Sequence, residues 1–397
     1  MQATPAEKRN VLLLASSQAL FQTASVMVMT IAGLVGQALA SDKRLATLPI
    51  AMMMVAAAAT MIPASLLMQR FGRKAGFLLG TTLGCAAGLL AATAIVLHDF
   101  ELFVLANMLV GAYQGFAQYY RFAAADVASA DFRSRAISWV VAGGVVAALA
   151  GPNLARVTQD LGAAPFAASY LVLFGISALA LLVVSRIAIP PMAAAQTQGS
   201  ARPLLEIMRQ PVFLTAVVGS SVGYAVMVMV MTATPLAMQI CGQSLGASTT
   251  VIQWHVLGMF VPSFFTGHLI HRYGVLRIMG VGTALLAGHV AIALSGIEFL
   301  HFLSGLILLG VGWNFLFVGG TTLLTESYRP SERAKTQAAH DFLMFGAVSL
   351  GSFSAGGLLN TGGWESVNGT VLPFLIGAAA MVLWLGLLRG RLAPPSA

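Results

Sequence analysis

Long apolar runs follow one another along the whole 397-residue chain, and they restrict its possible folds more than any other feature. A helix that crosses the hydrocarbon core of a bilayer needs about 20 mostly apolar residues, and runs such as 11–37 and 75–97 reach that length. Only 9% of the residues are charged, whereas soluble domains carry roughly a quarter. The sequence therefore predicts an all-α integral membrane protein embedded in the lipid bilayer, and it excludes a soluble enzyme and a disordered chain.

Breaks at charged residues, glycines and prolines divide the chain into twelve predicted membrane spans. The spans lie near residues 11–37, 46–69, 75–97, 101–125, 135–156, 165–187, 212–238, 248–270, 275–297, 301–325, 336–359 and 370–389. The longest polar connection separates the sixth span from the seventh. We therefore expect an N-terminal six-helix bundle over residues 1–187, a cytoplasmic linker over 188–211 and a C-terminal six-helix bundle over 212–397.

Positive charge is distributed unevenly between the connections. Of the 21 lysines and arginines, 17 fall on the side that holds the N-terminus, three fall on the other side, and Arg121 lies within a span. Because cytoplasmic loops carry an excess of Lys and Arg, both termini are predicted to be cytoplasmic, in the inner membrane of a bacterial-type cell. The basic residues are scattered between apolar runs, so the formal charge of +8 does not indicate a nucleic-acid partner.

Several sequence features recur at an offset of about 200 residues. The matched segments are Arg70-Phe71-Gly72 with Arg272-Tyr273-Gly274, Asp126 and Arg133 with Glu326 and Arg333, and Tyr113-Gln114 with Trp313-Asn314. Two six-helix halves with matching loops are typical of duplicated carriers.

The connection after the second span resembles the best-known loop of the major facilitator superfamily of secondary transporters. Arg70, Gly72 and Arg73 match that signature, whereas Gln69 stands where the family has Asp. The resemblance covers nearly the whole chain and implies two pseudo-symmetric six-helix halves, alternating access and a cytoplasmic charge network in which Arg73 pairs with Asp126. The candidates for this network are Arg70, Gly72, Arg73, Asp126, Arg133, Arg272, Gly274, Glu326 and Arg333.

Polar side chains form one face of the fourth span. Asn107, Gln114, Gln118 and Arg121 are separated by seven, four and three residues, which places them on one side of a helix. Because polar groups inside a membrane are costly, this face predicts a pathway for a solute. The other candidates for substrate binding are Gln18, Gln22, Tyr113, Tyr224, Trp313 and Asn314.

Arg121 has three possible roles, since it lies five residues before Asp126 and therefore about 7 Å from the cytoplasmic end of the span. It attracts an anionic or carbonyl-bearing solute, it forms a gate, or its side chain extends to the inner membrane interface. The gate hypothesis pairs Arg121 with Asp341 when the carrier is open outward and separates them when it is open inward.

All 13 acidic residues lie in connections or near span ends, so no carboxylate is expected at mid-membrane. Proton coupling would then use His255, His289 or His340, because imidazole changes charge near neutral pH. A hydrogen-bonded structural role is the alternative for a lone histidine among apolar residues. The sequence has neither a metal-ligand spacing nor a phosphate-binding loop, so we expect no metal and no cofactor.

These patterns together predict a secondary active transporter that moves a small organic solute by alternating access and couples it to protons, by symport or antiport. We expect no enzymatic activity and a functional monomer. The alternatives are an antiporter that exports amphipathic compounds, including drugs, and, as a less favoured function, a membrane sensor without transport.

Overall fold

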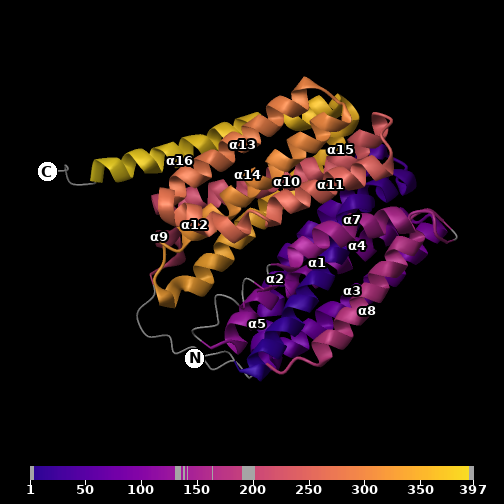
Figure 1. The fold of residues 1–397 in the computed structure, drawn as a ribbon, viewed down its shortest axis with the longest axis horizontal. Helices are drawn as coiled ribbons and strands as arrows, with labels where there is room; N and C mark the ends of the chain where they lie inside the picture. Colours follow the sequence, from indigo (N-terminus) through magenta and orange to yellow (C-terminus); the bar gives the residue numbers. More distant parts are fainter. Residues whose placement is uncertain are drawn as a thin grey trace.

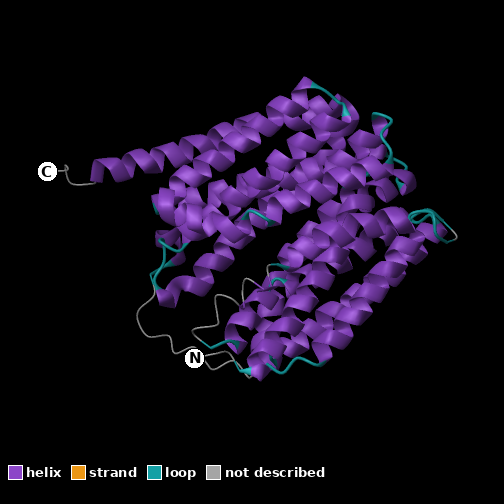
Figure 2. Cartoon of the chain, in the orientation of Figure 1, coloured by secondary structure: helices purple, strands orange, loops and turns teal. Residues whose placement is uncertain are grey.

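The computed structural model describes residues 4–129, 136, 139–140, 142–162, 164–189 and 202–392. Within those residues all regular structure is helical, and no strand occurs (Figure 2). Half of the predicted linker, residues 190–201, and Arg133 of the predicted charge network lie outside the described residues.

The first part of the chain forms helices that begin and end at recognisable local signals. Thr4 and Glu7 form a reciprocal capping box ahead of the first helix, and Asp99 accepts a hydrogen bond from a backbone N–H at the start of α4. The elements are α1 (Pro5–Leu39), η1 (Lys43–Leu45), α2 (Leu48–Phe71), α3 (Arg73–Leu97), α4 (Phe100–Ala117), α5 (Tyr120–Val127), α7 (Gly143–Thr158) and α8 (Ala167–Ser185).

The second part repeats this plan. Gly274 joins two helices with a φ of 88°, and Gly72 joins the corresponding pair with a φ of 85°, a backbone conformation that favours glycine. The elements are α9 (Leu204–Met208), α10 (Pro211–Ile240), α11 (Leu245–Phe260), α12 (Ser263–Tyr273), α13 (Val275–Ser295), α14 (Phe299–Leu324), η2 (Pro330–Glu332), α15 (Arg333–Gly369) and α16 (Leu372–Leu392).

The predicted spans agree with these helices, except that the fourth and the eighth span are each interrupted; the fourth is divided into α4 and α5. Among the described residues, nine helical stretches are long and apolar enough to cross a membrane, and one of them, Lys335–Gly390, covers the last two spans. The eighth span is divided into α11 and α12 next to Pro262, which has no N–H to donate. The fifth span is described only in part, as α7.

The helices gather into two groups, which Figure 1 shows as an indigo-to-magenta group and an orange-to-yellow group. In the first group α1 packs on α7, α2 and α3 pack on α4, and α3 packs on α8. In the second group the corresponding helices pair in the same way: α10 with α15, α11 and α13 with α14, and α13 with α16. The repeat in the sequence therefore corresponds to a repeat in helix packing.

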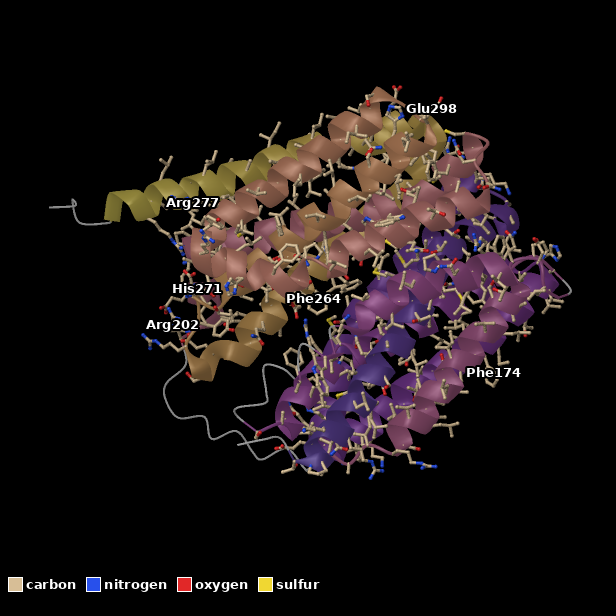
Figure 3. All side chains as sticks on the ribbon, viewed as in Figure 1. Phe174, Arg202, Phe264, His271, Arg277 and Glu298 are labelled. Atoms are coloured by element: carbon tan, nitrogen blue, oxygen red, sulfur yellow. The ribbon has the colours of Figure 1, made fainter. Side chains whose placement is uncertain are left out.

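Both ends of the described chain lie at one end of the molecule, which we call the basic face. Glu7 accepts a hydrogen bond from the backbone N–H of Ser129, just after α5, over 3.0 Å, and Arg389 pairs with Glu326 at 2.5 Å. Arg202, His271 and Arg277 also lie toward this end, whereas Glu298 lies at the other, which we call the opposite face (Figure 3). The cytoplasmic location of the basic face stays a prediction.

The two helix groups contact each other near the opposite face. Thr47 Oγ1 donates to the carbonyl of Ser352 over 3.3 Å and accepts from the backbone N–H of Gly356 over 3.0 Å. Asn153 of α7 donates to the side-chain oxygen of Gln253 of α11 over 3.0 Å. These contacts close the opposite face of the molecule.

Candidate functional site

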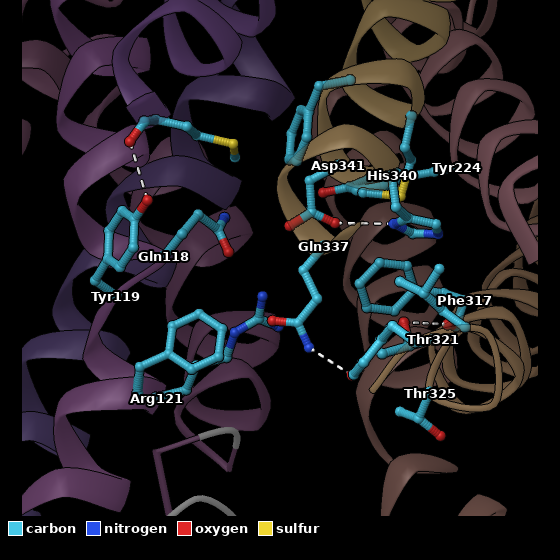
Figure 4. Close-up of a pocket in the computed structure, with 16 residues that line it drawn as sticks. Gln118, Tyr119, Arg121, Tyr224, Phe317, Thr321, Thr325, Gln337, His340 and Asp341 are labelled. Carbon is cyan, nitrogen blue, oxygen red and sulfur yellow. Dashed lines mark hydrogen bonds and ion pairs between the residues drawn. The ribbon is translucent and has the colours of Figure 1, made fainter. Parts of the chain in front are cut away.

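A cavity of about 700 Å³ lies between the two helix groups, toward the basic face (Figure 4). The helices α2, α5, α10, α14 and α15 and the junction between α4 and α5 line it, so both halves of the chain contribute side chains. The lining residues are Met61, Gln118, Tyr119, Arg121, Phe122, Tyr224, Phe317, Thr321, Leu324, Thr325, Tyr328, Gln337, His340, Asp341, Met344 and Phe345. Ligand cavities in proteins commonly enclose about 300–1,000 Å³, so this one accommodates a small organic molecule.

The wall from the first half carries a cation. Gln118 and Tyr119 lie at the interruption between α4 and α5, and the Tyr119 hydroxyl donates to the carbonyl of Met61 over 2.9 Å. The guanidinium carbon of Arg121 lies 4.9 Å from the centre of the Phe122 ring, a cation–π contact. Among the described residues Arg121 forms no ion pair, and its buried Nε has no hydrogen-bond partner. The cavity therefore offers a positive charge to an electron-rich group of a ligand.

The facing wall is aromatic. The Tyr224 ring lies edge-on to Phe317 and to Phe345, with centroid separations of 5.7 Å in both cases. Trp313 stacks on Phe317 from behind, with centroids 5.0 Å apart and planes inclined by 9°. Such mutual contacts fix the ring orientations, and they leave a π surface on which a flat ligand can stack.

A polar strip on α15 completes the cavity. Gln337 donates to the Tyr328 hydroxyl over 2.9 Å, and His340 Nδ1 lies 3.0 Å from Asp341 Oδ1. The His340 ring is buried, with its Nε2 lacking a partner, while the Asp341 side chain is 37% exposed. Figure 4 shows Arg121 and Asp341 on opposite sides of the cavity, and no ion pair joins them in the described structure.

Three of the ten substrate-binding candidates line this cavity: Gln118, Arg121 and Tyr224. The others lie away from it. Trp313 supports Phe317 from behind, and Tyr113 packs edge-on against Phe21 at 4.9 Å. Gln18, Gln22, Asn107, Gln114 and Asn314 also lie outside the lining.

Asn314 and Asn107 illustrate why candidates of this group lie outside the cavity lining. Asn314 accepts from Thr266 over 2.6 Å and donates to the carbonyl of Met259 over 2.7 Å, so it ties α14 to α11 and α12. Asn107 donates to the Phe103 carbonyl of its own helix over 2.8 Å. Both are fully buried within their own half. A substrate contact for these seven residues stays a prediction.

The described loop residues implied by the resemblance form separate contacts in the two halves. Arg73 pairs with Asp126 at 2.6 Å. Arg70 lies over the Phe71 ring and Arg272 over the Tyr273 ring, both at 5.3 Å. Glu326 pairs with Arg389, and Arg333 begins α15. The charge contact of the first repeat is thus present, and the second repeat uses a different partner.

The three candidate histidines occupy different surroundings. His255 Nδ1 lies 2.8 Å from the Leu306 carbonyl, and His289 Nδ1 lies 2.9 Å from the Gly305 carbonyl. Both rings are fully buried and tie α11 and α13 to α14. Only His340 of the three lies at the cavity. No group of three or more His, Cys, Asp or Glu side chains suited to a metal occurs in the described part of the chain.

The sequence interpretation missed Phe122, Phe317, Gln337 and Phe345 as cavity residues. A helical spacing signal was present, because Phe317 follows Trp313 by four residues and Gln337 precedes Asp341 by four. Phenylalanines are common in membrane spans, so this signal alone does not separate a cavity wall from a surface that contacts lipid.

Comparisons with known proteins agree with this architecture. The profile of the Major Facilitator Superfamily matches residues 14–242 and 220–397. The riboflavin transporter RfnT of Brucella anthropi is 43% identical over 373 residues, which cover 93% of this chain and 94% of that protein. The uncharacterized MFS-type transporter YdeG of Bacillus subtilis is 28% identical, over 97% of this chain and 93% of that protein.

Two solved structures share the fold. A bacterial homologue of the human lysosomal transporter Spinster, in an inward-facing and occupied conformation, superimposes with a TM-score of 0.73 at 16% identity, covering 100% of both chains. A mutant of the nucleoside transporter NupG gives 0.71 at 16% identity, over 94% of this chain and 99% of that one. The predicted family and the all-α membrane fold are confirmed. The chain is a multi-pass membrane protein and a secondary transporter of a small solute, not an enzyme, and it belongs to the major facilitator superfamily.

Proposed function

We propose that this protein carries riboflavin, or a flavin closely related to it, across the bacterial inner membrane, and that a proton moves in the same cycle. The proposal is supported by the 43% identity to a riboflavin transporter. The observation that carries it within this chain is the cavity itself, which places an aromatic wall opposite Arg121, an arginine that forms no ion pair among the described residues.

Riboflavin combines a flat three-ring system, edged by two carbonyl groups, with a chain of hydroxyl groups. The ring system suits stacking against Phe317 and Tyr224, and its carbonyl oxygens suit Arg121 and the amide of Gln118 as hydrogen-bond donors. The hydroxyl chain suits Gln337 and Asp341 on α15. An organic cation suits this cavity less well, because Arg121 would repel it.

Transport would proceed by rocking of the two bundles, residues 1–187 and 212–397, about the cavity in a single chain acting as a monomer. The basic face is then cytoplasmic, and the present structure is the inward-open state. Closing the cavity brings Arg121 of α5 toward Asp341 of α15, and their pairing holds that side shut. The linker over 188–211 keeps the two bundles in one chain.

Counterflow in proteoliposomes tests the substrate. Purified protein is reconstituted into vesicles loaded with unlabelled riboflavin, and entry of labelled riboflavin is followed against protein-free vesicles. We expect rapid entry that unlabelled riboflavin inhibits and that ribitol or an amphipathic organic cation does not. Entry at the rate of protein-free vesicles overturns the flavin proposal, and exchange of the cation instead would favour the efflux alternative.

A further inference from the structure

We infer that His340 and Asp341 together form the proton-binding site of this carrier, and that a proton and Arg121 compete for it. The inference rests on the proposed function for its substrate and for the movement of a proton in the same cycle. It begins from the contact between His340 Nδ1 and Asp341 Oδ1, which are 3.0 Å apart.

The surroundings make the pair asymmetric. The His340 side chain is 2% exposed, so its ring lies in the protein, while the Asp341 carboxylate is 37% exposed and faces the cavity. An imidazole whose Nδ1 contacts a carboxylate can take up a proton without leaving a buried charge unpaired, because the imidazolium and the carboxylate neutralise each other.

Few other groups at the cavity can exchange a proton. Asp341 is the only carboxylate among the lining residues, and His340 is the only histidine. The charged or titratable groups that face them from other elements are Arg121 on α5, Tyr119 before α5, Tyr224 on α10 and Tyr328 before η2. The lining residues from α2 and α14 are apolar or threonine. Phenols and guanidinium groups stay protonated at neutral pH. A proton from cavity water would therefore bind to the pair of His340 and Asp341.

The charge of the pair then decides whether the cavity can close without substrate. When the pair is deprotonated it carries one negative charge, and it attracts Arg121 from the facing wall, which draws the two halves together. When a proton from water binds an imidazole nitrogen, the pair becomes neutral overall, and the attraction for Arg121 is lost. No bond other than that N–H forms or breaks, and release returns the proton to water.

This competition links the solute to the proton. In the loaded carrier Arg121 binds the solute and the proton satisfies Asp341. After both have left into the space at the basic face, Arg121 and Asp341 can pair, and the empty carrier can return. A carrier that has released only the solute or only the proton cannot pair Arg121 with Asp341. We therefore expect the solute and the proton to move together.

The test compares exchange with accumulation in reconstituted vesicles. Exchange of riboflavin for riboflavin requires no net proton movement, whereas accumulation driven by a pH gradient does. We expect His340→Gln to lower gradient-driven accumulation by about tenfold, an ordinary size for coupling between two sites, and to retain exchange. His268→Gln is the matched control, since His268 is exposed on α12 outside the cavity.

A second measurement needs no substrate. The variant Thr325→Cys places a single cysteine in the cavity lining when Cys85 and Cys241 are both replaced by serine. The rate at which maleimide labels this cysteine, corrected for the ionisation of the thiol, measures how accessible the cavity is. We expect labelling to slow as the pH is raised from about 5 to about 8, because loss of the proton from the pair lets Arg121 draw the two halves together. We expect this dependence of the labelling rate on pH, the labelling slope, to vanish with His340→Gln and to persist with His268→Gln.

The outcomes separate the two proposals. Unchanged accumulation together with an unchanged labelling slope in His340→Gln overturns the proton site, whatever the substrate is. Absence of riboflavin exchange in the unmodified protein overturns the flavin proposal instead, and the labelling slope then still decides whether His340 and Asp341 bind the proton.

Discussion

The two ends of the interface between the halves are built from different chemistry. At the opposite face the halves meet through neutral groups, with Thr47 bonded to Ser352 and Gly356, and Asn153 bonded to Gln253. Toward the basic face the halves are separated by the cavity, whose walls carry aromatic rings and charges. One end is therefore closed by small neutral contacts, and the other is open between side chains of opposite charge.

This difference shows how each side can be controlled. Neutral contacts between small residues need little dehydration to form, so they depend mainly on shape. A contact between charged groups depends on what else neutralises them, whether a solute or a proton. The side that responds to ligands in this carrier is thus expected to be the basic face, and the following predictions test that assignment.

The largest effect on transport is expected from a bulky side chain at the opposite face, where the two halves contact each other. A Cβ atom at Gly356 would lie 2.6 Å from Thr47 Oγ1 and 3.0 Å from the Arg44 carbonyl, so Gly356→Leu should prevent these helices from meeting. Overpacking costs about 1–3 kcal/mol, which corresponds to a loss of up to about a hundredfold in riboflavin exchange. Gly357→Leu is the control, because a Cβ there meets nothing within 4 Å.

The same variant sharpens the comparison of the two faces. Holding the opposite face open should close the basic face, so labelling of a cysteine at Thr325 should slow in Gly356→Leu and not in Gly357→Leu. Equal transport by the two leucine variants would mean that the contact at Thr47 does not close the carrier.

The next effect concerns the charges across the cavity. Arg121→Asp or Asp341→Arg places like charges on the two walls, and each should lower riboflavin uptake by about tenfold. The double exchange restores opposite charges and should recover part of the loss, as uptake assays with all four proteins would reveal. If the double variant is no more active than either single variant, the hypothesis that Arg121 and Asp341 form a gate is wrong.

The sequence predicted the helical spans well because each span needs its own apolar length, and bilayer thickness sets that length. Gly72 and Gly274 illustrate the success: their loops recur in the sequence, and their backbones adopt nearly the same φ. The packing of corresponding helices follows the same repeat.

The cavity was harder to predict because a polar stripe does not reveal where its helix stops. Asn107, Gln114, Gln118 and Arg121 share one predicted face, yet the helix is interrupted between Ala117 and Tyr120. Gln118 and Arg121 reach the cavity, whereas Asn107 and Gln114 are buried inside the first half. At this interruption the Tyr119 hydroxyl donates to the Met61 carbonyl of α2, a contact between helices that sequence spacing does not encode.

A smaller effect is expected at the aromatic wall. Phe317→Leu keeps an apolar side chain but removes the ring on which a flavin would stack, and aromatic pairs contribute about 0.5–1.5 kcal/mol beyond burial. The KM for riboflavin should rise by about fivefold, with little change in maximal rate. Phe353→Leu is the control, since Phe353 is 53% exposed on α15. An unchanged KM in Phe317→Leu would mean that the flavin ring binds in another part of the cavity.

The smallest effect on transport is expected where the linker joins the second half. The Glu332 carboxylate is buried and accepts hydrogen bonds from the Arg202 side chain at 2.7 and 2.9 Å and from the Arg329 backbone N–H at 2.9 Å. The Arg202 guanidinium holds the pKa of Glu332 well below its usual range. A lowered pKa in the folded protein stabilises it above the carboxyl's ordinary pKa, and the stabilisation is lost as the pH falls through the lowered value.

Glu332→Gln should therefore lower the thermal unfolding midpoint in detergent, by the same amount at every pH between about 5 and 8, because the carboxylate stays ionised throughout. Riboflavin exchange below the melting temperature should change little, since Glu332 lies outside the cavity. Glu206→Gln, at an exposed position on α9, provides the control. A midpoint difference that shrinks between pH 8 and pH 5 would show that Glu332 gains a proton in that interval.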